Sequence, residues 1–222
     1  MTERETPSVD GLVIGILGGT GDQGRGLARR FALAGHQVII GSRSSERAAA
    51  AAQEIGHGVQ GLANADAARS ASVIIAAMPW EGHGDLLSAL AGELAGKIVV
   101  DCVNPLGFDQ RGAYALPVTE GSAAQQAAAL LPGSRVVAAF HHVSAVLLLD
   151  PEVDTIDLDV LVLGDDREAT DLVQALAARI PGVRGIYAGR LRNCGQIEAL
   201  TANLVSINRR YKAHAGLRVT DI

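Results

Sequence analysis

The amino-acid sequence predicts an α/β protein built on a doubly wound parallel sheet. Short apolar runs alternate with helix-forming stretches along the chain, as in repeated β-α units. The first run, residues 12–17 (LVIGIL), is apolar throughout, which is typical of a strand buried on both faces of a parallel sheet. A glycine-rich turn follows it directly and opens the first expected helix. These three observations place the chain in the α/β class.

The expected elements follow from this alternation. The apolar runs predict strands at residues 12–17, 38–40, 59–62, 73–77, 98–101, 136–140, 158–163 and 183–187. The stretches between them predict helices at 22–34, 44–55, 64–70, 83–94, 121–131, 166–180 and 190–214. Gly35 suits the C-terminal cap of the first helix, and Ser44 or Ser45 the N-cap of the second. Residues 102–120, which carry Pro105 and Pro117, are expected to be irregular.

The chain divides into three expected segments. Residues 1–10 are polar apart from two positions and contain Pro7, so we expect a flexible tail. Residues 11–140 carry the repeated β-α units and are expected to form the main domain. Residues 141–222 are too few for a second large domain. We expect them to form a small C-terminal α/β extension, either a cap or a dimerisation element, packed on the first domain.

Composition limits the classes of function. The net charge of −5 argues against a nucleic-acid binder that works by neutralising phosphates. Cys102 and Cys194 lie far apart, which favours a reducing cytoplasm without a disulfide framework. The first ten residues lack the apolar core of a signal peptide, and no apolar run approaches the roughly 20 residues needed to cross a bilayer. We therefore expect a cytoplasmic protein without membrane partners.

The glycine turn fits the dinucleotide-binding pattern G-x-G-x-x-G through Gly19, Gly21 and Gly24. Gly19 is expected to permit the tight turn, Gly21 to let the backbone approach a pyrophosphate, and Gly24 to permit close helix–strand packing. The following helix offers free N–H groups to the phosphates. The sequence thus predicts a Rossmann-type doubly wound parallel sheet, with a glycine-bearing turn that binds nothing as the alternative.

The end of the second strand predicts the choice of dinucleotide. Proteins that bind NAD usually place an acid there to hold the ribose 2′-hydroxyl. Here the sequence reads Gly41-Ser42-Arg43, so Arg43 can bind a 2′-phosphate and Ser42 can add a hydroxyl donor. Arg47 lies one helical turn further on and can reach the same phosphate. We therefore expect NADP(H), although a solvated helix end that happens to carry arginines is the simpler alternative.

Several familiar catalytic groups are missing. The only lysines are Lys97 and Lys212, and neither lies in a catalytic setting. His141 and His142 follow a strand at the edge where open sheets bind ligands, so they are candidates to line the site or to be structural. Trp80, also after a strand, either stacks on a flat ring or plugs a loop. Metal binding is not expected. The acceptor is therefore one that needs a hydride and little acid–base chemistry.

Five segments carry a family resemblance: GILGGTGDQGRGLARRFALAGHQVIIGSR, AAMPWEGH, KIVVDCVNP, VVAAFHHVSA and LTANLVSINRRYKAHAGLR. Over residues 12 to about 218 the chain resembles the NADPH:coenzyme F420 oxidoreductases of archaea and actinobacteria. The resemblance implies reversible hydride transfer between NADPH and the 5-deazaflavin coenzyme F420, with residues 141–222 completing the deazaflavin site. The apolar residues Leu200, Leu204 and Ile207 belong either to the core or to an interface, and we expect a homodimer. The protein would then mainly supply proximity and orientation.

The resemblance also implies roles for individual residues. The pyrophosphate would be held by Thr20, Gly21, Asp22 and Gln23. The 2′-phosphate would be held by Ser42, Arg43 and Arg47. The nicotinamide side would be lined by Met78, Val103, Val143 and Ala145. The deazaflavin side would be lined by Trp80, Asn104, Pro105, His141 and Leu217.

Two other functions stay open on the residues alone. One is an NADPH-dependent reductase of a flavin or an imine, and the other is a non-catalytic NADPH-binding sensor. The direction of transfer, its stereochemistry and the length of glutamate tail accepted on the deazaflavin are not predicted.

Overall fold

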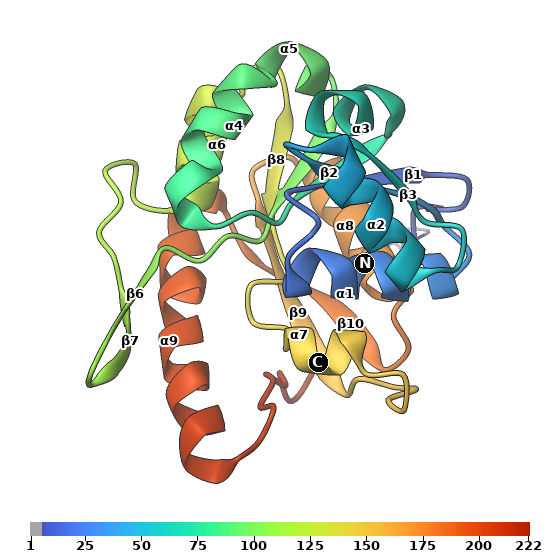
Figure 1. Cartoon of the computed structure of the whole chain (residues 1–222). Helices are drawn as coiled ribbons and strands as arrows, with labels where there is room; N and C mark the ends of the chain where they lie inside the picture. The colour runs from blue at the N-terminus through green and yellow to red at the C-terminus, as the bar shows by residue number, and fades with distance from the viewer. Residues whose placement is uncertain (1–5) are drawn as a thin grey trace.

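Eight strands form one sheet in the computed structural model, which describes residues 6–222. The strand order is β10-β9-β8-β5-β4-β1-β2-β3 (Figure 1). The strands of the sheet within residues 11–140 are β1 Val13–Leu17, β2 Gln37–Ser42, β3 Gln60–Ala63, β4 Val73–Ala76, β5 Ile98–Asp101 and β8 Arg135–Ala138. The sheet continues with β9 Leu158–Gly164 and β10 Val183–Gly189. The expected doubly wound α/β fold is confirmed.

Helices cover both faces of this sheet. They are α1 Asp22–Leu33, α2 Ser45–Ile55, α3 Asn64–Ser70, α4 His83–Ala89, α5 Ala91–Leu94, α6 Ala123–Leu130, α7 Ala145–Leu149, α8 Arg167–Ala177 and α9 Cys194–Tyr211. Short 3₁₀ turns, η1 Trp80–Gly82 and η2 Leu191–Asn193, precede α4 and α9. The buried side chains fall into two clusters, with α1, α2, α7 and α8 on one face and α3 to α6 on the other.

The central strands are parallel and buried. Ile14 of β1 lies opposite Val38 of β2 on one side and Val73 of β4 on the other. All four residues of β4 and of β5 are buried. This explains why their sequences are continuous apolar runs without polar alternation. From β1 the chain builds the sheet outward through β2 and β3, and from β4 it builds outward through β5 and β8 in the opposite direction. Open sheets bind ligands at such a switch point, beyond the carboxyl ends of the strands.

The C-terminal extension joins the same sheet with one antiparallel pair. Val137 and Ala138 of β8 lie opposite Gly164 and Leu163 at the end of β9. The start of β9 therefore extends beyond the carboxyl end of β8. β10 then pairs with β9 in parallel. The sheet is thus mostly parallel, with a single reversal where the extension begins.

The expectation that residues 102–120 are irregular is wrong. They contain a hairpin of β6 Leu106–Asp109 and β7 Gly112–Ala115, which lies along α9 (Figure 1). Asp109 forms the turn, because its Oδ1 accepts the N–H groups of Arg111 at 2.7 Å and Gly112 at 3.2 Å. Gly112 has φ +121°, which favours glycine.

Three helical expectations also change. The expected helix at 83–94 is two helices that meet at Leu90. The expected helix at 190–214 is η2 followed by α9, which ends where Lys212 turns left-handed at φ +51°. Helix α7 was not expected. Arg30 of α1 holds the carboxyl end of α7 and the segment after it, because it donates to the carbonyls of Leu148 at 2.9 Å and Val153 at 2.7 Å.

Residues 1–5 of the expected flexible tail lie outside the described residues. Val9, near the end of that tail, is buried at 5% exposure and packs into the core. Within residues 6–222, no helix has both the length and the apolar character needed to cross a bilayer.

Candidate active site

The predicted site residues lie on five neighbouring strand ends. In sheet order, β2 ends at Ser42, β1 at the glycine turn, β4 before Met78 and Trp80, β5 before Val103, Asn104 and Pro105, and β8 before His141 and Val143. Because these strands are parallel, their carboxyl ends form one continuous edge. Ala145 begins α7 just beyond His141. The structure thus brings together residues as far apart in the sequence as Gly19 and Ala145, which are separated by 126 positions.

Glycine is required at three positions of the turn for different steric reasons. Gly18, rather than the expected Gly19, adopts the left-handed conformation, at φ +66°. A Cβ on Gly19 would lie 2.7 Å from the Ile16 carbonyl oxygen, so this glycine lets the turn pass close to the sheet. A Cβ on Gly24 would lie 2.6 Å from the Cα of Gly19, so this glycine lets α1 pack closely against the turn, where packing against the strand was expected.

Gly21 differs from these glycines because it faces open space. A Cβ there would meet nothing within 4 Å. Gly21 is the N-cap of α1, and its carbonyl accepts the N–H of Arg25 at 2.9 Å. The N–H groups of Asp22, Gln23 and Gly24 therefore precede the first helical hydrogen bond and are available to an anion. The turn combines free donors with an unfilled approach, as a bound pyrophosphate requires.

The side chain of Gln23 is used within the protein. Its Nε2 donates to the Phe140 carbonyl oxygen at 3.1 Å. Phe140 is fully buried at φ +64°, a backbone conformation that is costly for a bulky residue. Gln23 therefore ties the first turn of α1 to the strained segment before His141. Its backbone N–H and the second N–H of Nε2 are left to contact a phosphate.

The end of β2 presents arginines beside a buried serine. Ser42 is 7% exposed, and its Oγ accepts the Ser44 N–H at 3.4 Å. Ser44 caps α2 by accepting the Arg47 N–H at 3.2 Å. Arg43 and Arg47 are exposed, and neither forms an ion pair within the described part of the chain. The Gly19 N–H donates to the Gly41 carbonyl at 3.0 Å, so this end of β2 adjoins the glycine turn.

Apolar side chains continue the edge beyond the turn. Met78 lies against Gly18, since a Cβ on that glycine would be 2.7 Å from the Met78 Cβ. Val103 and Val143 are 3% and 5% exposed. The Val103 N–H is fixed by Oδ1 of Asp101 at 3.0 Å. These contacts hold the backbone at the strand ends in place.

A buried ion pair, not anticipated from the sequence, lies under this edge. Nε2 of His83 is 2.6 Å from Oδ2 of Asp101, and both side chains are fully buried. Nδ1 of His83 is 3.0 Å from Oε1 of Gln126. Burial alone would lower the pKa of His83, but the hydrogen bond and charge of Asp101 outweigh it and raise that pKa. An imidazolium that donates from both ring nitrogens satisfies both neighbours.

This pair links the two sides of the candidate site. The rings of His83 and Trp80 lie 5.5 Å apart at 33°, within the range of a cation–π contact. Asp101 meanwhile holds the backbone of Val103. Trp80 and Val103 are thereby fixed through one ion pair.

Asn104 and His141 are joined at the next two strand ends. The Asn104 Nδ2 donates to the His141 carbonyl at 2.8 Å, and Thr201 of α9 donates to Asn104 Oδ1 at 3.3 Å. Thr201 therefore brings α9 to the site. Glu198, one turn earlier, accepts the N–H groups of Ala123 at 2.9 Å and Ala124 at 3.2 Å and so fixes α9 to the start of α6.

The two histidines have different surroundings. His142 Nε2 accepts the Leu161 N–H at 3.3 Å, which gives this residue a structural role between β8 and β9. His141 is 4% exposed, and neither of its ring nitrogens has a partner among the described residues. Burial lowers the pKa of His141 to about 4, so its ring is neutral at pH 7. A buried neutral imidazole with both nitrogens free fits a polar ligand.

Two predicted residues lie toward the margins. Pro105 is buried and leads directly into β6. Leu217 lies on the C-terminal segment, where its carbonyl accepts the Asp159 N–H at 2.8 Å near the start of β9. Asp159 also binds Arg184 through two contacts of 2.7 Å. No group of three or more His, Cys, Asp or Glu side chains within residues 6–222 is arranged to hold a metal ion.

The fold and the glycine turn define a Rossmann-type dinucleotide-binding protein. Residues 13–105 match the model of the family described as NADP oxidoreductase, coenzyme F420-dependent. The F420-dependent NADP reductase of Methanothermobacter marburgensis is 40% identical, covering 95% of this chain and 99% of its own length. The enzyme of the same name from Methanocaldococcus jannaschii is 39% identical over the same shares.

A solved structure agrees with these sequences. It is a protein from Arthrobacter sp. FB24 described as a candidate F420-dependent NADP reductase, with a TM-score of 0.82 and 29% identity. The match covers 95% of this chain and 100% of that one. The chain belongs to the F420-dependent NADP reductase family.

Proposed function

We propose that this protein catalyses reversible hydride transfer between NADPH and the deazaflavin coenzyme F420. The observation that carries the proposal is the order of the site along the sheet. Arginines at β2, free N–H groups at β1, apolar side chains at β4 and β5 and an unpartnered imidazole at β8 follow one another. A 2′-phosphate, a pyrophosphate, a nicotinamide and a deazaflavin would meet these groups in the same order.

NADPH would be held mainly by backbone and by charge. The N–H groups of residues 20–24 would bind the pyrophosphate, and the open face of Gly21 would admit it. Arg43 and Arg47 would bind the 2′-phosphate as charge-assisted donors, with Ser42 as a further donor. The carboxylate of Asp22 repels phosphate, so Asp22 would contribute only its N–H.

The two bound rings would supply the hydride chemistry, so the protein needs to position them and exclude water. Lys97 takes no part, because its Nζ donates to the carbonyls of Ala71 at 2.7 Å and Arg69 at 3.0 Å. Those contacts lie at the start of β5, on the opposite edge of the sheet. The absence of a lysine from the site supports transfer without a proton relay.

The deazaflavin would lie between the ends of β4 and β8. Trp80 offers a flat ring, and neutral His141 offers one donor and one acceptor to the ring edge. His83 and Asp101 would act as positioning residues, because they hold Trp80 and Val103 from below. Asn104, Pro105 and Leu217 stay outer candidates on the same side.

We also propose a cytoplasmic homodimer and the division into residues 11–140 and 141–222. The exposed side chains of Ile207 and Tyr211 on α9, 40% and 72% exposed, support an interface there. They lie one turn apart, so they share a helix face. The single reversal of strand direction after β8 supports the division of the chain at residue 140.

Purified protein mixed with NADPH and one of three acceptors tests the proposal. The acceptors are a deazaflavin, a flavin and a cyclic imine, and NADPH oxidation is followed by absorbance. We expect turnover with the deazaflavin at a kcat/KM at least about tenfold above the others. Faster turnover with flavin or imine would assign a different reductase. NADPH binding without turnover of any acceptor would indicate a sensor.

A further inference from the structure

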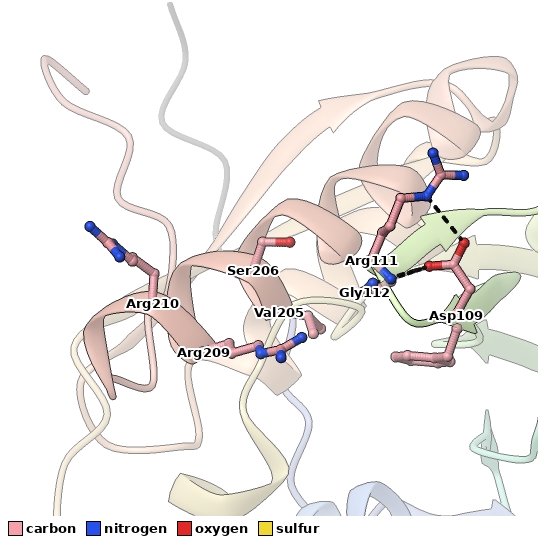
Figure 2. Close-up of a pocket in the computed structure, with 9 residues that line it drawn as sticks. Asp109, Arg111, Gly112, Val205, Ser206, Arg209 and Arg210 are labelled. Atoms are coloured by element: carbon pink, nitrogen blue, oxygen red, sulfur yellow. Dashed lines mark hydrogen bonds and ion pairs between the residues drawn. The ribbon is translucent and has the colours of Figure 1, made fainter.

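An open groove of about 520 Å³ lies between α9 and the β6–β7 hairpin. The hairpin contributes Phe108, Asp109, Arg111, Gly112 and Ala113, and α9 contributes Val205, Ser206, Arg209 and Arg210. Figure 2 shows Val205 and Arg209 on the side of α9 toward the hairpin, and Arg210 directed away from it. None of them has a role in the hydride-transfer site described above.

The groove is basic in an otherwise acidic protein. It contains three arginines and one aspartate, whereas the whole chain has a net charge of −5. Asp109 is already engaged, since its Oδ2 lies 3.7 Å from Nε of Arg111 and its Oδ1 caps the hairpin turn. Arg209 and Arg210 form no ion pair within residues 6–222. The end of a helix favours cations, but this does not explain Arg111 across the groove.

The groove is also continuous with the candidate site. Thr201, Val205 and Arg209 recur every four residues and therefore lie on one face of α9. Thr201 contacts Asn104 and the His141 carbonyl at the site, and Val205 and Arg209 line the groove. The hairpin likewise starts directly after Pro105. From Thr201 to Arg209 the helix rises by about 12 Å.

We infer that this groove binds the anionic tail of the deazaflavin acceptor. Coenzyme F420 carries a phosphodiester and glutamate carboxylates on a flexible chain, which is the charge that the groove complements. The phosphodiester and the successive carboxylates lie along one flexible chain, so a tail with more glutamates places more negative charge in the groove. The inference rests on the proposed function.

A second copy of this chain is the competing occupant. Ile207 lies two residues after Val205, which is about 200° around the helix. The exposed apolar side chains Ile207 and Tyr211 therefore face away from the groove. The face of α9 that carries Val205 and Arg209 and the apolar face that carries Ile207 and Tyr211 can thus serve a ligand and an interface separately, with Arg210 at the border between them.

The test compares three deazaflavin acceptors that carry no tail, a one-glutamate tail and a tail of four or more glutamates. We expect KM for the wild type to fall as the tail lengthens and to rise with ionic strength for the longest tail. The double variant Arg209→Gln/Arg210→Gln should raise KM for the longest tail about threefold to tenfold, the scale of two exposed ion pairs. KM for the tail-less acceptor and for NADPH should stay at the wild-type values.

The matched control is Arg69→Gln/Arg167→Gln, which removes two exposed arginines near the opposite edge of the sheet. It should keep the wild-type dependence on tail length. Equal KM for all three acceptors in the wild type would overturn the inference while leaving hydride transfer intact. A double variant that changes the molar mass in light scattering but keeps the tail dependence would assign the groove to a subunit interface. Failure of every deazaflavin to react would instead refute the proposed function.

Discussion

Replacing Gly21 and Gly24 one at a time should separate ligand binding from stability of the turn. In Gly24→Ala the new Cβ would lie 2.6 Å from the Cα of Gly19, against the 3.4 Å at which ordinary contact begins. The overlap of 0.8 Å is with backbone, which cannot rotate away. Overpacking of this kind costs about 1–3 kcal/mol, and improved helix propensity returns about 1 kcal/mol. We expect a lower free energy of unfolding together with weaker NADPH binding.

Gly21→Ser should behave differently. Its side chain enters space in which nothing lies within 4 Å, and serine is a favourable N-cap residue. The free protein should therefore be as stable as the wild type or slightly more so. The added hydroxyl, however, occupies the approach to the free N–H groups and competes for them. Loss of one charge-assisted hydrogen bond, about 1.5–3 kcal/mol, weakens NADPH binding at least tenfold.

Urea unfolding of the free variants and NADPH titration by fluorescence measure these two effects. Gly92→Ala is the matched control, because a Cβ at Gly92 also meets nothing within 4 Å and this residue lies on α5. It should bind NADPH as the wild type does. If Gly21→Ser binds NADPH with unchanged affinity, the open space over Gly21 is not where the pyrophosphate binds.

Three further predictions concern cofactor choice, the buried ion pair and pH. Arg43→Ala should raise the Kd for NADPH by about tenfold to 150-fold, the equivalent of 1.5–3 kcal/mol, and leave NADH binding unchanged by calorimetry; an equal loss for NADH would contradict the 2′-phosphate assignment. Asp101→Asn leaves the buried His83 without its counter-charge, so unfolding in urea should show a loss of about 3–5 kcal/mol; a loss below 1 kcal/mol would show that the pair is not charged. Burial raises the pKa of Glu198 to about 7, against the opposing effect of two backbone N–H donors, so its contribution to stability is full below pH 4.5 and is lost as the pH rises through 7. Glu198→Gln should remove that decline in a pH series of unfolding free energies; an unchanged decline would assign it elsewhere, for example to His83, whose raised pKa acts above pH 6.5.

The sequence was sufficient for most of the sheet because the signal is local. Continuous apolar runs predicted strands such as residues 73–77 and 98–101, and the structure has β4 at Val73–Ala76 and β5 at Ile98–Asp101. A parallel strand that is buried on both faces carries apolar side chains at successive positions, so it can be recognised as a continuous apolar run. The glycine turn was predictable for the same reason, since its three motif glycines, Gly19, Gly21 and Gly24, fall within six residues directly after a strand.

The hairpin and the buried pair depend on contacts that the sequence does not display. Residues 106–115 contain two glycines and an exposed Phe108, so they lack an apolar run; packing on α9 stabilises them. His83 and Asp101 are 18 positions apart on different elements, and only the fold makes them partners. Glu198 meets the N–H of Ala123 across 75 positions. The one signal in the sequence is that Asp101 is an acid at the end of an otherwise apolar strand, where a buried carboxylate needs a partner.

Isotope transfer tests the central claim most directly. NADPH deuterated at both C4 positions is oxidised by the protein with the deazaflavin in ordinary water, and the reduced acceptor is analysed by mass spectrometry. The account predicts one deuterium in the reduced deazaflavin for each NADP⁺ formed, because the hydride passes directly between the two rings. Reduced acceptor that carries only solvent hydrogen, or no reduced acceptor at all, would contradict it.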